Sequence, residues 1–283
     1  TDIREDTEGW MITDTATTPA SGASPGGTVV DRALVDKATL LLEEWFKNTA
    51  EPSTYGNYLM AVSLAMQERY KEALPFIRKT TAQSEPRENF LTLQLAVEYQ
   101  NGNVPETLEV LKTLAGHFPK KNYFTQLSYA YSNAGDDVAA LAVFELAYLQ
   151  GWLDKEKDLL SLAQRQYALD VPYKAVQVIQ KGMQDGLIEP SRDSYELLAN
   201  TLLSAREWKA ALDPLRKAAE LSTDGGIYVR LAQVYLELED WAAARKSLDA
   251  ALEKGNLKDT ANAHLLLGIA QYNQKQYDTA KRS

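Results

Sequence analysis

The sequence predicts an all-α fold, a right-handed superhelical solenoid of helix-turn-helix repeats. Three observations predict it. From Asp31 onward the sequence favours helices throughout, small residues recur at intervals of about 34 residues, and short turn motifs such as Asn101–Asn103 and Ala134–Asp137 separate the helical stretches at the same period. Each unit of such an array packs only against its neighbours, so 283 residues can form one array without dividing into globular domains.

Two small residues in each unit define the repeat, because only a short side chain lets two helix backbones approach where they cross. The first-helix series is Ala61, Ala96, Ser128, Ala163, Ala199, Ala232 and Gly268. The second-helix series, twelve residues later, is Ala73, Thr107, Ala140, Ala175, Ala211, Ala244 and Ala280, in which Thr107 comes one residue early and predicts a shorter turn. A large apolar residue follows four positions on, as in Ile77 and Leu111. This is the pattern of the tetratricopeptide repeat.

The repeat pattern divides the chain into a tail and a solenoid. Residues 1–30 are rich in Thr, Ala, Ser, Gly and Pro and predict a flexible tail, in which the apolar cluster Gly9–Ile12 could occupy the protein's own groove. The solenoid, 31–283, is predicted to contain a lone second helix at 34–50, six full repeats over about 54–256, and a partial repeat at 261–283. Because this last repeat lacks a polar cap, we expect the natural chain to continue there or to self-associate.

Glycines are expected to end three of the second helices. Gly151, Gly186 and Gly255 are each followed closely by apolar residues. This arrangement predicts a left-handed glycine cap whose next residues fold back on the helix.

Composition and motifs argue against several functions. With 39 acidic and 30 basic residues the formal charge is -9, which disfavours nucleic acid and anionic membranes as partners. There is no cysteine, and the two histidines, His117 and His264, are interpreted as structural residues, so no metal or cofactor is expected. Gly22–Gly26 fits a nucleophile motif, but no strand precedes it, and we expect no catalytic residue and no enzyme activity. No apolar stretch reaches the roughly 18 residues of a membrane span.

The groove lined by the first helices is the predicted binding surface for a partner. Aromatic rings give contact area at low entropic cost, and amides can bond a peptide backbone in either polarity. Basic residues are scarce on this face, Lys157 being the main one, so a clamp for an acidic peptide tail is not expected. The mixture fits an extended peptide, and it would also fit a glycan strand. The predicted lining residues are Tyr55, Tyr58, Phe90, Asn122, Tyr129, Asn133, Gln164, Tyr167, Asn200, Gln233, Tyr272 and Asn273.

Several short stretches, most of them in the second half of the chain, carry a family resemblance. They are Phe118–Lys121, Tyr148–Leu153, Val171–Ala175, Lys181–Ile188, Leu238–Trp241 and Lys254–Lys258. Through them the chain, from about residue 54 to 283, resembles the tetratricopeptide-repeat components of the bacterial TonB system. The resemblance implies a non-enzymatic scaffold in the periplasm of Gram-negative bacteria, with TonB-system components as partners. A peptidoglycan-binding or envelope-assembly module is the alternative. The tail does not match that family.

Overall fold

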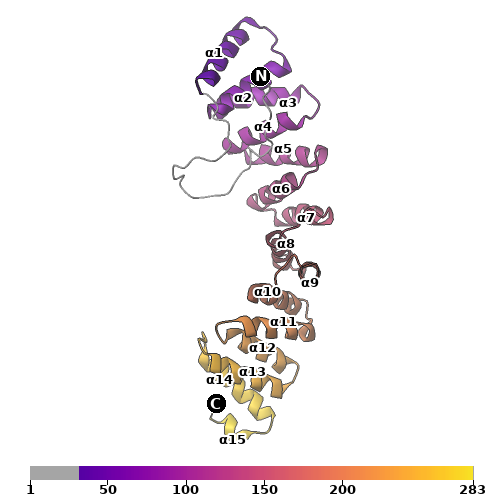
Figure 1. Ribbon diagram of the computed structural model, residues 1–283, viewed down its shortest axis with the longest axis vertical. Coiled ribbons are helices and arrows are strands. Elements are labelled where there is room, and N and C mark those ends of the chain that lie inside the picture. The colour runs from indigo at the N-terminus through magenta and orange to yellow at the C-terminus, as the bar shows by residue number, and fades with distance from the viewer. Residues whose placement is uncertain (1–31, 283) are drawn as a thin grey trace. The chain divides into compact units, whose positions relative to one another are not determined.

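The computed structural model describes residues 32–282, and these residues form helices joined by short connections (Figure 1). No strand occurs between residues 32 and 282. The chain divides into two compact units, Thr1–Val143 and Phe144–Ser283. The predicted tail with Gly9–Ile12 and Gly22–Gly26 lies outside the described residues. The all-α array of helix pairs predicted from the sequence is confirmed.

The N-terminal unit begins with a single helix, after which the helices come in pairs. We call the members of each pair its first and second helix. The helices are α1 (Arg32–Asn48), α2 (Thr54–Met66), α3 (Tyr70–Ala82), α4 (Glu88–Gln100), α5 (Val104–His117), α6 (Lys121–Asn133) and the beginning of α7 (Asp137–Leu149). Helix α1 is fastened to α2 by polar contacts, since the buried Thr39 hydroxyl lies 2.6 Å from that of Ser63 and Gln67 donates to Thr39 at 2.8 Å.

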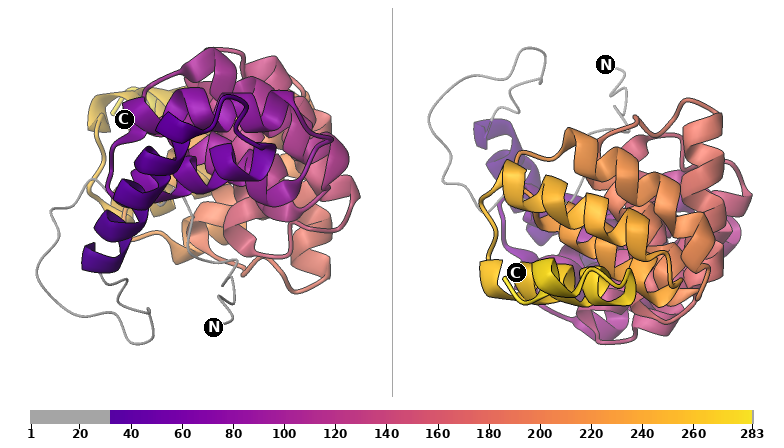
Figure 2. Two further views of the ribbon diagram at one scale, coloured as in Figure 1. Left: turned by 90° about the horizontal axis from the view of Figure 1, so that it is seen from above. Right: turned by 90° about the horizontal axis from the view of Figure 1, so that it is seen from below.

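The C-terminal unit continues the same alternation from the end of α7. Figure 2 shows its last helices, in orange and yellow, packed side by side. The helices are α8 (Glu156–Ala168), α9 (Pro172–Gln184), α10 (Arg192–Ser204), α11 (Trp208–Leu221), α12 (Gly226–Glu237), α13 (Trp241–Lys254), α14 (Thr260–Asn273) and α15 (Tyr277–Ala280). The partial repeat expected at 261–283 thus corresponds to α14 and the four-residue α15.

The small residues that define the repeat lie at the helix crossings. Ala61, Ala163, Ala199 and Ala232 of the first helices are completely buried. So are Ala73, Ala140, Ala175, Ala211 and Ala244 of the second helices. In the third repeat the small residue of the first helix is Ser128, and its hydroxyl donates to the carbonyl of Ala140 at 2.7 Å. The large apolar residues four positions on, such as Ile77 and Leu215, are also fully buried, and each contributes about 1.5–3 kcal/mol of hydrophobic stabilisation.

One turn geometry joins the two helices of every described pair. The turn has three residues, and the middle one has a positive φ. These residues are Glu68, Gly102, Gly135, Asp170, Arg206, Glu239 and Lys275. The following N–H donates five residues back, as from Val171 to the Gln166 carbonyl at 2.9 Å, which satisfies a carbonyl at the end of the helix.

The second repeat corrects the sequence alignment by one residue. Gly102 lies seven residues after Leu95, as Glu68 lies seven after Ala61, so Leu95 and not Ala96 occupies the first-helix crossing. Thr107 is therefore in register, and the shorter turn predicted for this repeat is wrong. Leu95 is buried while Ala96 is half-exposed. Because Leu95 is larger than alanine, α4 and α5 pack less extensively than α2 and α3.

Two of the three turns between repeats have the predicted glycine cap, since Gly151 and Gly186 have φ values of 73° and 72° and the N–H after each donates five residues back. The left-handed cap predicted at Gly255 is wrong, because its φ of 72° is combined with an extended ψ. The apolar residues that follow return to the core, where Leu153 is 4% and Ile188 is 1% exposed. Each repeat is thereby sealed against the next within its own unit.

Candidate interaction surface

The exposed side of the first helices is the strongest candidate for a binding surface, and we call it the first-helix face. In α2 it is an apolar stripe of Tyr55, Leu59, Val62 and Met66, whose spacing places all four on one side of a helix. Tyr55 is 59% and Met66 48% exposed, although both are apolar. Exposed apolar side chains gathered on one face are typical of an interaction site.

Helices α4 and α6 continue this face in the N-terminal unit with aromatic and polar residues. Tyr99 and Tyr129 are each 45% exposed. Around them lie Asn89, Thr92, Ala96, Gln100, Asn122, Thr125, Ser132 and Asn133, all exposed or half-exposed. The combination of tyrosine with amides and hydroxyls gives rigid contact area together with adaptable hydrogen bonding.

In the C-terminal unit the first-helix face changes character from helix to helix. Helix α8 presents Lys157, Gln164 and Tyr167, the last 40% exposed. Helix α12 presents Gln233 and Glu237. Helix α14 carries the most apolar part, with Leu265 and Tyr272 each 62% exposed and Ile269 41% exposed.

A polar network joins α10 and α12 on the first-helix face of the C-terminal unit. The Arg230 guanidinium of α12 donates to Glu196 Oε1 at 2.7 Å and also donates to the side-chain carbonyl of Asn200. The predicted groove residue Asn200 therefore has its acceptor engaged by Arg230. The arginine was not among the predicted residues, because its contact with the preceding repeat depends on packing and not on spacing.

Eleven of the twelve predicted residues are exposed or half-exposed, and one was wrong. Phe90 is 2% exposed and packs on Tyr58, with ring centroids 4.6 Å apart. The one-residue error in the second repeat explains this, since it moved the predicted surface positions onto the core side of α4. Tyr99 is the exposed aromatic that the corrected register finds. The sequence prediction also missed Leu59, Leu265, Ile269 and Arg230.

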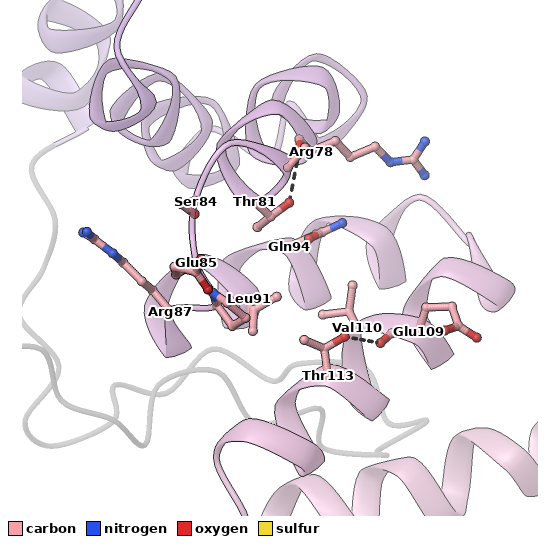
Figure 3. Close-up of a pocket in the computed structure, with 12 residues that line it drawn as sticks. Arg78, Thr81, Ser84, Glu85, Arg87, Leu91, Gln94, Glu109, Val110 and Thr113 are labelled. Carbon is pink, nitrogen blue, oxygen red and sulfur yellow. Dashed lines mark hydrogen bonds between the residues drawn. The ribbon is translucent and has the colours of Figure 1, made fainter.

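A hollow of about 390 Å³ opens beside the second helices of the N-terminal unit, and a neighbouring one of about 450 Å³ shares Arg78, Gln94, Glu109 and Val110 with it. Figure 3 shows side chains of α3, α4, α5 and the α3–α4 connection around the first hollow. Three of the four charged side chains that line it contact other groups of the protein: Arg78 pairs with Glu98 and Glu106, Glu109 pairs with Lys112, and Arg87 lies over the ring of Phe90. The fourth charged side chain is that of Glu85.

Burial and ion pairing shift several pKa values in this unit. Burial alone would raise the pKa of Glu98, but hydrogen bonds from Arg78, Asn103 and Gln94 outweigh it and the pKa is lowered. The pKa of Glu88 is lowered in the same way: burial would raise it, but the hydrogen bonds that Lys120 and Tyr123 donate to the carboxylate prevail. Burial and the Glu88 contact raise the pKa of Tyr123. Each group keeps its ordinary charge at neutral pH, and none is poised for proton transfer.

Within residues 32–282 no group of three or more His, Asp or Glu side chains is placed to hold a metal ion. None of the helices in that range combines the length and apolarity of a membrane crossing.

A tetratricopeptide-repeat family model matches residues 229–280, from α12 into α15. Over these residues the chain matches the tetratricopeptide repeat. The same three-residue turn and buried small residues recur from α2 onward, so the described helix pairs are repeats of one kind.

Solved structures with similar folds are distant in sequence. The C-terminal part of a TPR repeat-containing protein from Cytophaga hutchinsonii is 14% identical, with 81% of this chain and 94% of that chain covered and a TM-score of 0.48. A tetratricopeptide repeat protein from Parabacteroides merdae is 14% identical, covering 86% and 94%, with a TM-score of 0.42. MamA from Desulfovibrio magneticus is 17% identical, covering 60% and 96%, with a TM-score of 0.43. No curated protein matches the sequence.

Proposed function

We propose that this protein is a non-enzymatic scaffold that holds an extended segment of a partner protein against its first-helix face. The tetratricopeptide repeats support protein partners, since stacked helix pairs of this kind create extended binding surfaces. The observation that carries the proposal is the recurrence of exposed tyrosines at one repeat position: Tyr99, Tyr167 and Tyr272 each lie three residues before the positive-φ turn residue of their repeat. Rigid aromatic anchors that recur at one repeat position suit an extended partner segment.

We further propose that the partner belongs to a TonB-type transport system and that the scaffold works in the periplasm. The support for this part is the resemblance carried by stretches such as Lys181–Ile188 and Leu238–Trp241. In the structure these stretches form a turn between repeats and a turn between paired helices, so they maintain the fold of the repeats and do not belong to the first-helix face. The identity of the partner accordingly has to be tested on the surface residues.

Site-specific photocrosslinking in living cells tests both parts. A photoreactive phenylalanine analogue replaces Tyr129 or Tyr167 on the first-helix face, and as a control it replaces Tyr173, which is 63% exposed on the second helix α9. We expect crosslinks to a TonB-system protein from the first two positions and none from Tyr173. Crosslinks to an unrelated protein from the same two positions would support the scaffold function but contradict the proposed TonB-system partner. Equal crosslinking from all three positions would contradict the proposal that the first-helix face is the binding surface.

Glycan binding is the second candidate, and it is favoured by exposed amides one helical turn from tyrosines, such as Asn133 beside Tyr129. Sedimentation with purified cell wall separates the two functions. If the wild type sediments and the Tyr129→Ala/Tyr167→Ala variant does not, the surface binds glycan. A protein scaffold leaves both in the supernatant.

A further inference from the structure

We propose that the first-helix face of the N-terminal unit binds an extended protein segment that carries no charged side chains. The inference rests on the proposed function and deepens it, because it names the class of segment that α2, α4 and α6 select. It follows from the juxtaposition of exposed tyrosines, amides and hydroxyls on a face where no charged side chain is available.

The first helices of this unit contain few charges, and those few are engaged. Helix α2 has none. In α4, Glu98 is completely buried and held by Arg78, and Glu88 accepts hydrogen bonds from Lys120 and from the Tyr123 hydroxyl. In α6 the one charged residue is Lys121, at the first position of the helix. None of these three belongs to the first-helix face.

The neutrality of this face contrasts with the rest of the chain. Charged residues make up 24% of the sequence, and the second helices α3 and α5 carry them in numbers, for example Lys71, Glu72, Lys79 and Lys112. In the C-terminal unit the first-helix face carries charges on α8, α10 and α12, with Lys157, Asp193, Glu196 and Glu237, whereas α14 has none. A face without charge is therefore a property of particular first helices, among them α2, α4 and α6, and not of every repeat.

A neutral face discriminates against charged partners through desolvation. A carboxylate or ammonium group that leaves water on binding must recover its hydration energy from an opposite charge or from several hydrogen bonds. This face offers no opposite charge, so each charged side chain brought against it weakens binding. A neutral segment suffers no such loss, and its backbone can bond to the amides of Asn89, Asn122 and Asn133.

The apolar members of the face favour a peptide over a sugar. Leu59 is 38% and Met66 48% exposed, and these aliphatic side chains can enclose the apolar side chains of a peptide. Methionine adapts its shape to different side chains and is over-used at peptide-binding surfaces. A sugar ring would stack on the flat tyrosine rings and would leave Leu59 and Met66 exposed to water.

Selection from a display library of random peptides, with the full chain as bait, tests the inference. We expect the enriched peptides to contain fewer Asp, Glu, Lys and Arg residues than the input library. The Tyr99→Ala/Tyr129→Ala variant should bind the enriched peptides at least about tenfold more weakly, because exposed aromatic anchors dominate such interfaces. Tyr173→Ala, which removes an exposed tyrosine from a second helix, should bind them as the wild type does.

A charge placed on the face gives an independent readout. Thr92→Lys puts an ammonium group on the first-helix face, whereas Thr113→Lys puts the same group on the second helix α5. Selection with the Thr92→Lys variant should enrich acidic peptides, and selection with the Thr113→Lys variant should match the wild type. Circular dichroism at each step confirms that the variants are folded.

The remaining outcomes separate the inference from the function on which it rests. Enrichment of charged peptides whose binding still depends on Tyr99 and Tyr129 overturns the neutral specificity and leaves the scaffold standing. Failure to enrich any peptide that depends on these tyrosines overturns both. Binding of chito-oligosaccharide that is lost in the Tyr99→Ala/Tyr129→Ala variant overturns the inference in favour of a glycan.

Discussion

Arg78 of α3 and Glu98 of α4 form a two-pronged ion pair, in which Nε donates to Oε1 at 2.7 Å and Nη2 donates to Oε2 at 2.8 Å. The Glu98 side chain is 0% exposed, whereas that of Arg78 is 42% exposed. Asn103 completes the set by donating to Oε2 at 2.6 Å. A buried carboxylate is tolerated only when it is paired and hydrogen-bonded, so the stability of this repeat depends on the arginine.

Replacing Arg78 with methionine should destabilise the protein by about 2–3 kcal/mol. The change keeps much of the aliphatic packing but leaves the Glu98 carboxylate buried without its counter-charge. This expected loss is smaller than the roughly 3–5 kcal/mol for breaking a fully buried ion pair, because Arg78 is partly open to solvent. Urea denaturation at neutral pH, followed by circular dichroism, measures it.

The double variant Arg78→Met/Glu98→Leu supplies the control. Leu64 and Leu202 occupy the position equivalent to Glu98 in two other repeats and are buried there, at 2% and 4% exposure. Replacing a buried ion pair by apolar residues is often neutral, so we expect the double variant to lie within about 1 kcal/mol of the wild type. A double variant as unstable as Arg78→Met would show that the ion pair has a structural role that leucine cannot supply.

The same pair predicts a stability loss in acid. Burial opposes ionisation of Glu98, but its hydrogen bonds prevail, and its pKa in the folded protein lies below the value of about 4.3 for an unfolded chain. A lowered pKa stabilises the fold above the unfolded value, and this contribution disappears as the pH falls through the folded value. The free energy of unfolding should therefore fall more steeply below about pH 4.3 in the wild type than in the double variant. Parallel pH profiles of the two proteins would contradict the assignment to Glu98.

Two glycines should respond to alanine with opposite signs. Gly135 has a φ of 81° in the turn before α7, whereas Gly116 lies within α5, and a Cβ at either position would meet no atom within 4 Å. Gly135→Ala should cost about 1 kcal/mol, because an L side chain disfavours this backbone conformation. Gly116→Ala should stabilise the protein by up to about 0.5 kcal/mol, because alanine loses less entropy in a helix. Thermal denaturation of the two variants distinguishes the signs, and a neutral Gly135→Ala would count against a positive-φ requirement.

The fold could be predicted from sequence because sterics at the helix crossings limit which residues fit there. Ala163 and Ala175, for example, recur at the predicted places and are fully buried. The error in the second repeat arose because Ala96 resembles the residue expected at the crossing, while the actual occupant, Leu95, does not. The turn glycine Gly102 would have been the better marker, since its distance from the crossing is the same in every repeat.

The candidate surface was less predictable for a different reason. Spacing placed Tyr129, Tyr167 and Tyr272 on the exposed side of their helices, where the structure finds them. Contacts between repeats do not follow from spacing, however, and the hydrogen bonds of Arg230 to Glu196 and Asn200 required the packed structure. What these residues bind stays a prediction until the crosslinking and selection experiments are done.

Replacing Gly182 with alanine should make its new Cβ atom collide with the side chain of Ile188. The peptide N–H groups of Leu187 and Ile188 donate to the Gly182 carbonyl at 2.8 and 3.0 Å, which brings the Ile188 side chain directly over the glycine. A Cβ on Gly182 would lie 2.5 Å from Ile188 Cδ1 and 2.8 Å from Cγ1, closer than atoms can pack. Ile188 is 1% exposed and has little room to move, so Gly182→Ala should destabilise the protein by about 2 kcal/mol.

A second substitution tests whether this contact is the cause. Ile188→Val removes the Cδ1 atom and alone should cost about 1 kcal/mol. If the two residues conflict as the structure indicates, the Gly182→Ala/Ile188→Val variant should be more stable than the sum of the single effects, by roughly 1 kcal/mol. Urea denaturation of all four proteins closes the cycle. Additive effects would mean that the alanine is accommodated elsewhere, or that its cost comes from the α9 backbone and not from Ile188.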